Sequence, residues 1–265
     1  MKRLVLAVVL GAVGCGACGD DDDDGAVPDA QVDGPVSDAA IPDAAPIDAF
    51  EVCPGAELFT GDYRDWVTDA ALFDATLTEI GNETNTAATA PNGRGELCLE
   101  SGSQADVRFT GGCPGGDCGP AADYLALVHG YDSTAQQVGS FFAPGITGTD
   151  ADALYEDELS LTRDSGSATV MVDVREYPGG TALVGTTVSI NVARDGAFTR
   201  DSGGVWTAGA TITDDPVVLF ANAVTGSGSV GITVTPPAGY TCAGRTTMTV
   251  EADGVSVTAY SCSAD

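Results

Sequence analysis

The sequence is short of the side chains on which most enzyme active sites and nucleic-acid interfaces depend. Its 265 residues include one histidine, His129, and 10 lysines and arginines against 39 aspartates and glutamates. A single histidine leaves little for general acid–base catalysis, because histidine is the side chain most often used for it. The formal charge of −29 offers no basic face for phosphates, so we expect no nucleic-acid partner. The sequence holds no cofactor motif, and we expect no cofactor.

No apolar run is long enough to span a bilayer as a helix. Residues 4–13 form an uncharged run of roughly half the ~20 residues that a membrane-spanning helix needs. The basic start Met1-Lys2-Arg3 precedes this run and small residues follow it, which is typical of a secretory signal peptide. We therefore expect residues 1–14 to be a signal that is removed on export.

The small residues lead directly to a cysteine, in the sequence Ala12-Val13-Gly14-Cys15. This resembles the lipobox of bacterial lipoproteins, in which the signal is cut before a cysteine that then carries lipid. The resemblance implies a lipid anchor at Cys15, and therefore an exported protein held at the cell envelope, in the outer membrane or on the cell surface of a bacterium. Cys18 is the alternative anchor, because an even number of cysteines then remains to form disulfides.

Basic residues are missing altogether from residues 15–51. Between residues 20 and 51 there are eleven acidic side chains, mixed with alanine and proline. Such a segment has too little apolar surface to form a core, and its like charges repel. We expect a disordered acidic tether. The large negative charge favours solubility and the adsorption of divalent cations.

From residue 52 onward, short runs rich in β-branched residues alternate with turn residues. This pattern predicts strands in an all-β sandwich architecture. The expected strands cover residues 75–80, 95–100, 105–111, 124–129, 168–177, 186–193, 216–224, 230–236, 246–252 and 255–262.

One stretch departs from the strand pattern. Residues 147–166 are predicted to hold a short helix, with Thr149 capping it through Asp152 and with leucines on one face. We place a helical junction there, between a first sandwich over residues 52–146 and a second over residues 167–265.

The two halves match each other at an offset near 110 residues, which predicts a tandem repeat. The matches are residues 75–80 with 186–191, 90–95 with 200–205, 106–111 with 216–221, and 128–132 with 237–241. Residues 74–102 and 183–242 resemble the carboxypeptidase regulatory-like, or transthyretin-like, seven-stranded β-sandwich. The first strand leads through a polar stretch to Gly95, and the sequence Pro-Ala-Gly-Tyr ends at Tyr240. The family's usual glycine is Asp74 here, and Glu96 follows Gly95 in place of its aromatic. The resemblance implies two tandem transthyretin-like sandwiches that are non-catalytic.

Export makes disulfides the expected state of the six cysteines in the folded part. Their spacing permits 15 connectivities. Closeness in sequence favours Cys113–Cys118 and Cys242–Cys262, which leaves Cys53–Cys98. Two thiols without a nearby histidine make a poor zinc set, so we expect no structural metal.

Catalytic candidates are few. Ser202 lies in Arg-Asp-Ser-Gly-Gly, which is similar to the nucleophile loop of trypsin-like proteases, although that loop has glycine where Arg200 stands. A hydrolase using His129 and Ser202 is therefore the least favoured alternative. Trp66 and Trp206, with Tyr63 or Tyr131, favour a second alternative, an extracellular carbohydrate-binding module.

The leading interpretation is a lipid-anchored envelope protein with non-catalytic binding or structural modules. Its expected partners are the membrane, through the lipid, and an envelope protein or polysaccharide. The only cation that the sequence suggests is Ca²⁺ adsorbed on acidic loops such as those of Asp150, Asp152 and Asp157.

Overall fold

The structure is a computed structural model that describes residue 53 and residues 55–100, 104–114, 123–133 and 141–265. The predicted signal peptide, both candidate lipid anchors and the acidic tether lie outside these ranges. The described chain is built mainly of strands: β1 Glu57–Asp65, β2 Leu72–Phe73, β3 Thr76–Glu79, β4 Asn82–Ala88, β5 Arg94–Leu99, β6 Gln104–Thr110, β7 Cys113–Pro114, β8 Leu127–Asp132, β9 Phe141–Gly145, β10 Ser167–Glu176, β11 Thr187–Ile190, β12 Gly196–Arg200, β13 Trp206–Ala208, β14 Val217–Val224, β15 Ser229–Thr235, β16 Tyr240–Gly244, β17 Thr247–Thr249 and β18 Val255–Ala264.

The all-β prediction is confirmed, since each expected run contains a strand. The strands pack face to face around two apolar clusters, one of which includes Phe59, Leu77 and Phe109 and the other Val170, Val188 and Phe220. No helix in the described ranges is long and apolar enough to cross a membrane.

The pairing pattern of the strands recurs in the two halves of the chain. In the first half, β1 pairs antiparallel with β5 and parallel with β9. In the second half, β10 pairs antiparallel with β14 and parallel with β18. The same backbone bridge follows each opening strand, between Arg64 and Ala71 and between Arg175 and Ala182. These bridges are 111 residues apart, which agrees with the offset predicted from the sequence.

The match of residues 90–95 with 200–205 falls mainly on turns. Of the three matches that fall on strands, only that of residues 75–80 with 186–191 agrees with this pattern. This match makes β3 the counterpart of β11. Strand β6 lies beside β3 in its sheet, and β15 lies beside β11 in its sheet. The counterpart of β6 in the second half is therefore β15, and not β14 as the match at residues 216–221 predicted. The match of β8 with β16 is wrong for the same reason, because β17 is the strand beside β15.

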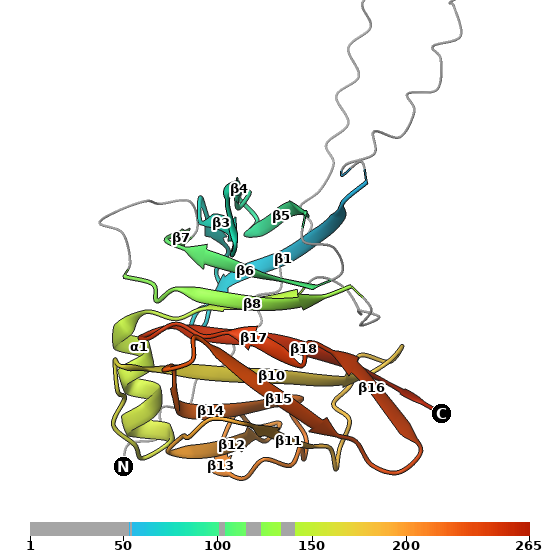
Figure 1. Ribbon diagram of the computed structural model, residues 1–265. Helices are drawn as coiled ribbons and strands as arrows, with labels where there is room; N and C mark the ends of the chain where they lie inside the picture. Colours follow the sequence, from blue (N-terminus) through green and yellow to red (C-terminus); the bar gives the residue numbers. More distant parts are fainter. Residues whose placement is uncertain (1–52, 54, 101–103, 115–122, 134–140) are drawn as a thin grey trace, which may run out of the picture. The chain divides into compact units, whose positions relative to one another are not determined.

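A single ten-stranded sheet runs through both halves. Its order is β13-β12-β14-β10-β18-β8-β6-β3-β4, with β16 paired to β18 off this path. The link is the parallel pair β18–β8, which joins Val255–Thr258 to Leu127–Gly130 (Figure 1). The division into two sandwiches at residues 147–166 stays a prediction, since strands from both sides of it share this sheet.

Polar contacts accompany the link between the halves. Asp106 on β6 is buried, and its Oδ2 accepts hydrogen bonds from Thr249 N and Oγ1, at 3.0 and 2.7 Å. Its Oδ1 forms an ion pair at 3.2 Å with Arg245 Nε, at an angle that makes no hydrogen bond. Arg108 on the same strand pairs with Glu251. Strand β6 is thereby held to the segment around β17 by buried and half-buried charge.

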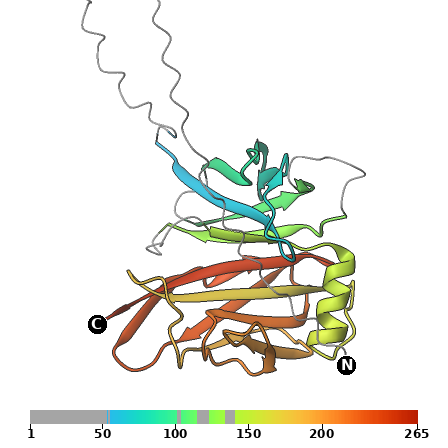
Figure 2. The same ribbon diagram turned by 180° about the vertical axis from the view of Figure 1, so that it is seen from behind.

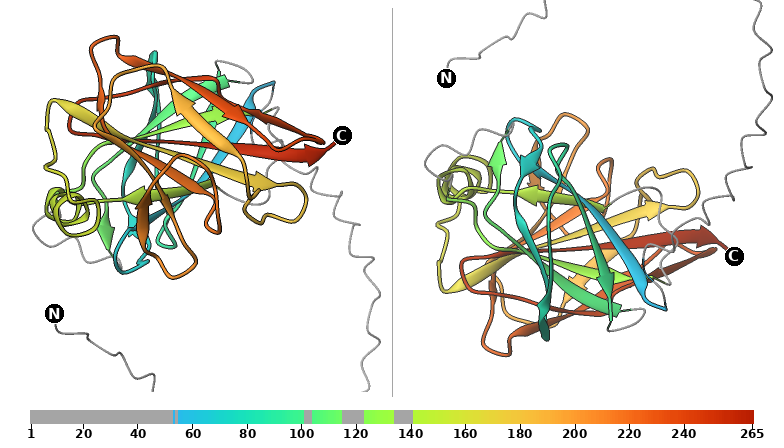
Figure 3. Two further views of the ribbon diagram at one scale, coloured as in Figure 1. Left: turned by 90° about the horizontal axis from the view of Figure 1, so that it is seen from below. Right: turned by 90° about the horizontal axis from the view of Figure 1, so that it is seen from above.

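The helical segment consists of α1, Gly148–Ala153, and the π-helical turn η1, Leu154–Glu158. Its cap is Thr147, whose side chain accepts a hydrogen bond from Asp150 N, so the prediction of Thr149 as the cap is wrong by two residues. Leu154 and Leu159 are buried as expected. The segment stands beside the ends of the long strands (Figure 2), and the C-terminus lies at their opposite ends (Figure 3).

A buried asparagine ties this segment to the sheet. Asn222 on β14 has φ of 50° and donates from Nδ2 to Thr162 O and Asp195 Oδ2, at 2.9 and 2.7 Å. Its Oδ1 accepts from Asp164 N at 3.0 Å. Its backbone N–H donates to the Tyr155 hydroxyl at 3.0 Å. The turn after η1 is thus fixed by hydrogen bonds rather than left as an open linker.

Candidate functional site

The structure does not bring His129 and Ser202 together. His129 is on β8, while Ser202 is exposed in the turn between β12 and β13. Strands β12 and β8 are separated in the sheet by β14, β10 and β18. At about 4.8 Å between neighbouring strands, the two strands are roughly 19 Å apart. The hydrolase alternative with these two residues is therefore wrong.

His129 is a core residue. Its side chain is 1% exposed, and its ring lies edge-on to Phe59 with 5.6 Å between the ring centroids. Burial lowers the pKa of His129 from 6.5 to about 3. The imidazole is neutral at physiological pH, and water does not reach it for proton exchange with a substrate.

Trp66 and Trp206, which are far apart in sequence, gather around one arginine. The Arg200 guanidinium carbon lies 5.5 Å from the ring centroid of Trp66 and 5.5 Å from that of Trp206. Asp215 Oδ2 accepts from Arg200 Nε and Nη2, at 3.1 and 2.8 Å, and fixes the guanidinium in place. We call these four residues the Trp–Arg cluster.

Both turns next to the Trp–Arg cluster are held by aspartates. Asp65 is buried and accepts from Thr68 N, Thr68 Oγ1 and the Tyr124 hydroxyl, each at 2.7 Å. Burial opposes its ionisation, but these bonds outweigh that effect and hold the pKa of Asp65 below its usual value. In the second turn, Asp201 accepts from Gly203 N and Val205 N. The cluster is therefore built on a rigid frame.

The ring surface left for a ligand in the Trp–Arg cluster is small. Trp206 is only 6% exposed, and Trp66 is half-buried against the core. Tyr63 and Tyr131, the other aromatic residues proposed for sugar stacking, are buried. Arg200 and Asp215 hold the cluster together. They were not identified from the sequence, because the local sequence pattern does not show which turns lie next to each other in the folded chain.

Two of the predicted disulfides are confirmed. Cys53–Cys98 and Cys242–Cys262 are formed, with Cα–Cα distances of 5.5 and 4.0 Å. Cys113 is disulfide-bonded as well, and its predicted partner Cys118 lies outside the described residues.

Two of the three carboxylates expected to adsorb Ca²⁺ already interact with other side chains of the protein. Asp150 accepts from Thr147 Oγ1 at 2.6 Å, and Asp152 pairs with Arg163 at 2.7 Å. Asp157 is exposed. In the described ranges, no group of three or more histidine, cysteine or acidic side chains could hold a metal ion. Adsorption of Ca²⁺ stays a prediction.

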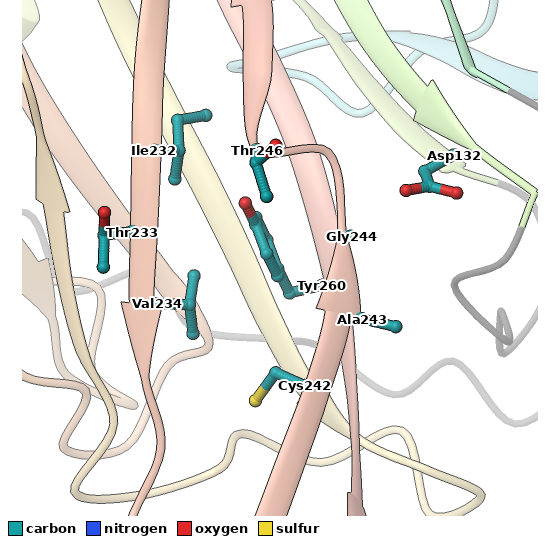
Figure 4. A pocket seen from close by; sticks show the side chains of 9 residues that line it. All are labelled: Asp132, Ile232, Thr233, Val234, Cys242, Ala243, Gly244, Thr246 and Tyr260. Atoms are coloured by element: carbon teal, nitrogen blue, oxygen red, sulfur yellow. The ribbon is translucent and has the colours of Figure 1, made fainter.

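A cavity of about 470 Å³ lies between β15 and β16. Figure 4 shows Ile232 and Val234 on one side, Cys242 and Gly244 on the other, Tyr260 between them and Asp132 beyond Gly244, on the side away from Ile232. We call this cavity the β15–β16 slot. Sequence analysis missed it, because it depends on two successive strands joining different sheets.

Comparisons with known proteins give no family. No family model matches the sequence, and no curated protein matches it. Among solved structures, the Bacillus anthracis TIE protein is 11% identical with a TM-score of 0.26, over 79% of this chain and 34% of that one. The shaft pilin SpaA from Lactobacillus rhamnosus GG is 10% identical with a TM-score of 0.25, over 78% and 97%. GBS52, the minor pilin of Streptococcus agalactiae, is 7% identical with a TM-score of 0.26, over 79% and 97%.

This chain spans about a third of the Bacillus anthracis protein. At TM-scores this low, the likeness carries no argument about fold or function, and both rest on the chain's own residues.

Proposed function

We propose that this protein is exported, anchored by lipid at Cys15 or, as the alternative, Cys18, and acts at the cell envelope through non-catalytic binding or structural β-sandwich modules. The observation that carries the non-catalytic part is the burial of His129. The only histidine of the sequence has a pKa lowered to about 3, and Ser202 is at the far side of the sheet.

Export and anchoring have separate support. The signal-like start and the lipobox-like Ala12-Val13-Gly14-Cys15 point to the envelope. The disulfides at Cys53–Cys98 and Cys242–Cys262 fit an oxidising compartment. The finer assignment, to two transthyretin-like sandwiches, is part of the proposal and is supported by the recurring strand pairing.

The test is the chemistry of the mature N-terminus. The chain should be purified from envelopes in detergent and its first peptide analysed by mass spectrometry, which we expect to show an acylated Cys15. An acylated Cys18 would move the anchor but keep the proposal. An unmodified or uncut chain would overturn the anchor.

The non-catalytic role has its own assay. The same preparation should turn over no ester, peptide or polysaccharide above the rate of a Ser202→Ala, His129→Ala double variant. Any turnover that the double variant loses would refute this part of the proposal.

Carbohydrate binding is the second candidate, and the half-buried Trp66 ring beside Arg200 is the observation that favours it. A glycan array should then show binding that Trp66→Ala removes. Trp206→Phe is the matched control, because the buried Trp206 ring has too little exposed surface to stack on a sugar. Binding that both variants retain would exclude the cluster as its site.

A further inference from the structure

The β15–β16 slot lies between two strands that follow each other in the chain but do not pair. In the described part of the chain, β15 pairs with β11 and β17, and β16 pairs with β18 alone. The connection over residues 236–239 therefore opens outward instead of closing a hairpin.

One wall of the slot is an unpaired edge of β15. Strand β17 covers only Ser229–Gly231 on this edge, while β11 covers Ile232–Thr235 on the other. Ile232 N donates to Thr246 O at 2.8 Å, so its N–H points to the β17 side. Because alternate residues of a strand point to the same edge, the N–H and C=O of Val234 point to that side too, where β17 has already ended.

The opposite wall is the free edge of β16. Cys242 and Cys262 face each other across the β16–β18 pair with a Cα–Cα distance of 4.0 Å, which is the narrow, non-hydrogen-bonded type of pair. Asp265 N donates to Gly239 O, so residues 239 and 265 form a hydrogen-bonded pair. Such pairs occur at every second residue, so the odd-numbered residues of β16 direct their N–H and C=O groups toward β18. The N–H and C=O groups of Cys242 and Gly244 therefore point away from β18 and toward the slot.

The floor of the slot is apolar and packed. Tyr260 is 5% exposed, and a Cβ on Gly244 would come within 2.6 Å of Tyr260 Cδ1, so the backbone of β16 lies directly on the ring. Ile232 is buried and Val234 is half-buried. Such a floor accepts alternate side chains of an extended segment, while polar backbone edges on both sides supply hydrogen-bond partners.

The lining of the slot includes one carboxyl group, that of Asp132. Asp132 is buried, accepts from Gln104 Nε2 at 2.9 Å, and contributes after burial to raising the pKa of Tyr260 to about 12. The whole chain is strongly acidic, and the segment between residues 20 and 51 has no basic residue. Charge therefore disfavours both that segment and a second copy of this chain as the occupant.

We propose that the β15–β16 slot binds an extended segment of a partner protein as an added β-strand, with an arginine or lysine of that segment beside Asp132. This deepens the proposed non-catalytic binding role and rests on it. Backbone pairing with Val234 and Cys242 supplies affinity, and the carboxyl group selects the sign of the partner's charge.

The probe is a heptapeptide of alternating threonine and valine with arginine at both ends, titrated calorimetrically into the full mature chain in detergent. We expect saturable binding. A peptide with glutamate at both ends should bind at least about tenfold more weakly, and so should the arginine peptide with alternate backbone nitrogens methylated. No saturable binding, or binding unaffected by methylation, would overturn the proposal.

Two variants of the chain locate the binding. Asp132→Asn should bring the arginine and glutamate peptides to about equal affinity, whereas Asp214→Asn, an exposed aspartate that does not line the slot, should leave their ratio unchanged. Val234→Pro removes an N–H that neither the β11 nor the β17 ladder uses, and should weaken binding of the arginine peptide about tenfold. If Val234→Pro does not fold, the methylated peptide carries the same test.

The same experiment also tests whether something other than a basic partner occupies the β15–β16 slot. Tighter binding of a peptide with the sequence of residues 26–48, or self-association of the chain that the arginine peptide disperses, would overturn the assignment to a basic partner. Any of these failures would leave the N-terminal mass spectrum, and with it the proposed lipid anchoring, unaffected.

Discussion

At the scale of single residues, burial decides what His129 contributes. In the unfolded chain its imidazole takes up a proton below pH ~6.5, whereas the folded chain keeps it neutral down to about 3. The unfolded state therefore binds more protons throughout this interval. The stabilisation of the folded state by the neutral, buried imidazole is fully present above the pKa that His129 has in the unfolded chain. It is lost as the pH falls toward the lower pKa that His129 has in the folded chain.

We expect the free energy of unfolding of the parent chain to fall relative to His129→Gln by about 1.4 kcal/mol between pH 7.5 and pH 5.5. Glutamine carries no charge at either pH, so the difference isolates the imidazole from the many carboxylates. Urea titrations of both chains at the two pH values measure it. An equal change in both chains would show that His129 titrates normally in the folded protein.

At the scale of elements, Asn222 joins the helical segment to β14 through bonds from both of its side-chain atoms. Asn222→Ala removes these bonds and places an alanine at φ of 50°, and we expect it to cost about 3 kcal/mol. Asn222→Gly removes the bonds but tolerates the backbone, so it should cost less. Urea unfolding measures both, with the exposed Ser202→Ala as a control expected to change stability by less than about 0.5 kcal/mol. Equal costs for alanine and glycine would contradict the role of the positive φ.

Elements with runs of apolar, β-branched residues were predictable from the sequence, and those without such runs were missed. The runs that became β10, β14 and β18 are rich in valine. Strand β1 was missed because two of its core-facing positions are Gly61 and Asp65. A Cβ on Gly61 would lie 3.2 Å from the rings of Phe59 and Phe109, and Asp65 is buried because its hydrogen bonds are satisfied.

Edge strands and long-range clusters were beyond the sequence for other reasons. Among the described residues, strand β4 pairs with β3 alone, and its mostly polar side chains face solvent, so no hydrophobic pattern marks it. The Trp–Arg cluster and the β15–β16 slot depend on which turns and edges meet after folding. Local propensity carries no such information.

At the scale of the whole molecule, the shared sheet predicts one cooperative unfolding step. The β18–β8 pair and the Asp106 contacts join the two halves, so neither half keeps its edge covered when the other unfolds. Each half contains one tryptophan. Fluorescence of Trp206→Phe follows the first half, and that of Trp66→Phe follows the second.

We expect each single-tryptophan chain to show the same urea midpoint by fluorescence as by far-UV circular dichroism. Two separate midpoints in one chain would instead favour independently folding sandwiches with a boundary at residues 147–166. Limited proteolysis then gives an independent reading, because cuts in that segment would release two β-rich fragments.

The positions of the two disulfides have a mechanical consequence. A pull on the chain ahead of Cys53 reaches β1 and, through the bridge to Cys98, β5 at the same time. At the other end, a pull on the C-terminus meets Cys262, which is bridged to Cys242. The segments between the bridged cysteines, with sequence separations of 45 and 20, cannot lengthen under tension. Each opening strand also lies parallel to the closing strand of its half, so tension along them shears a row of hydrogen bonds together instead of unzipping them singly. A protein held at one end by a lipid and at the other by a partner would resist extension in the direction in which the envelope pulls it.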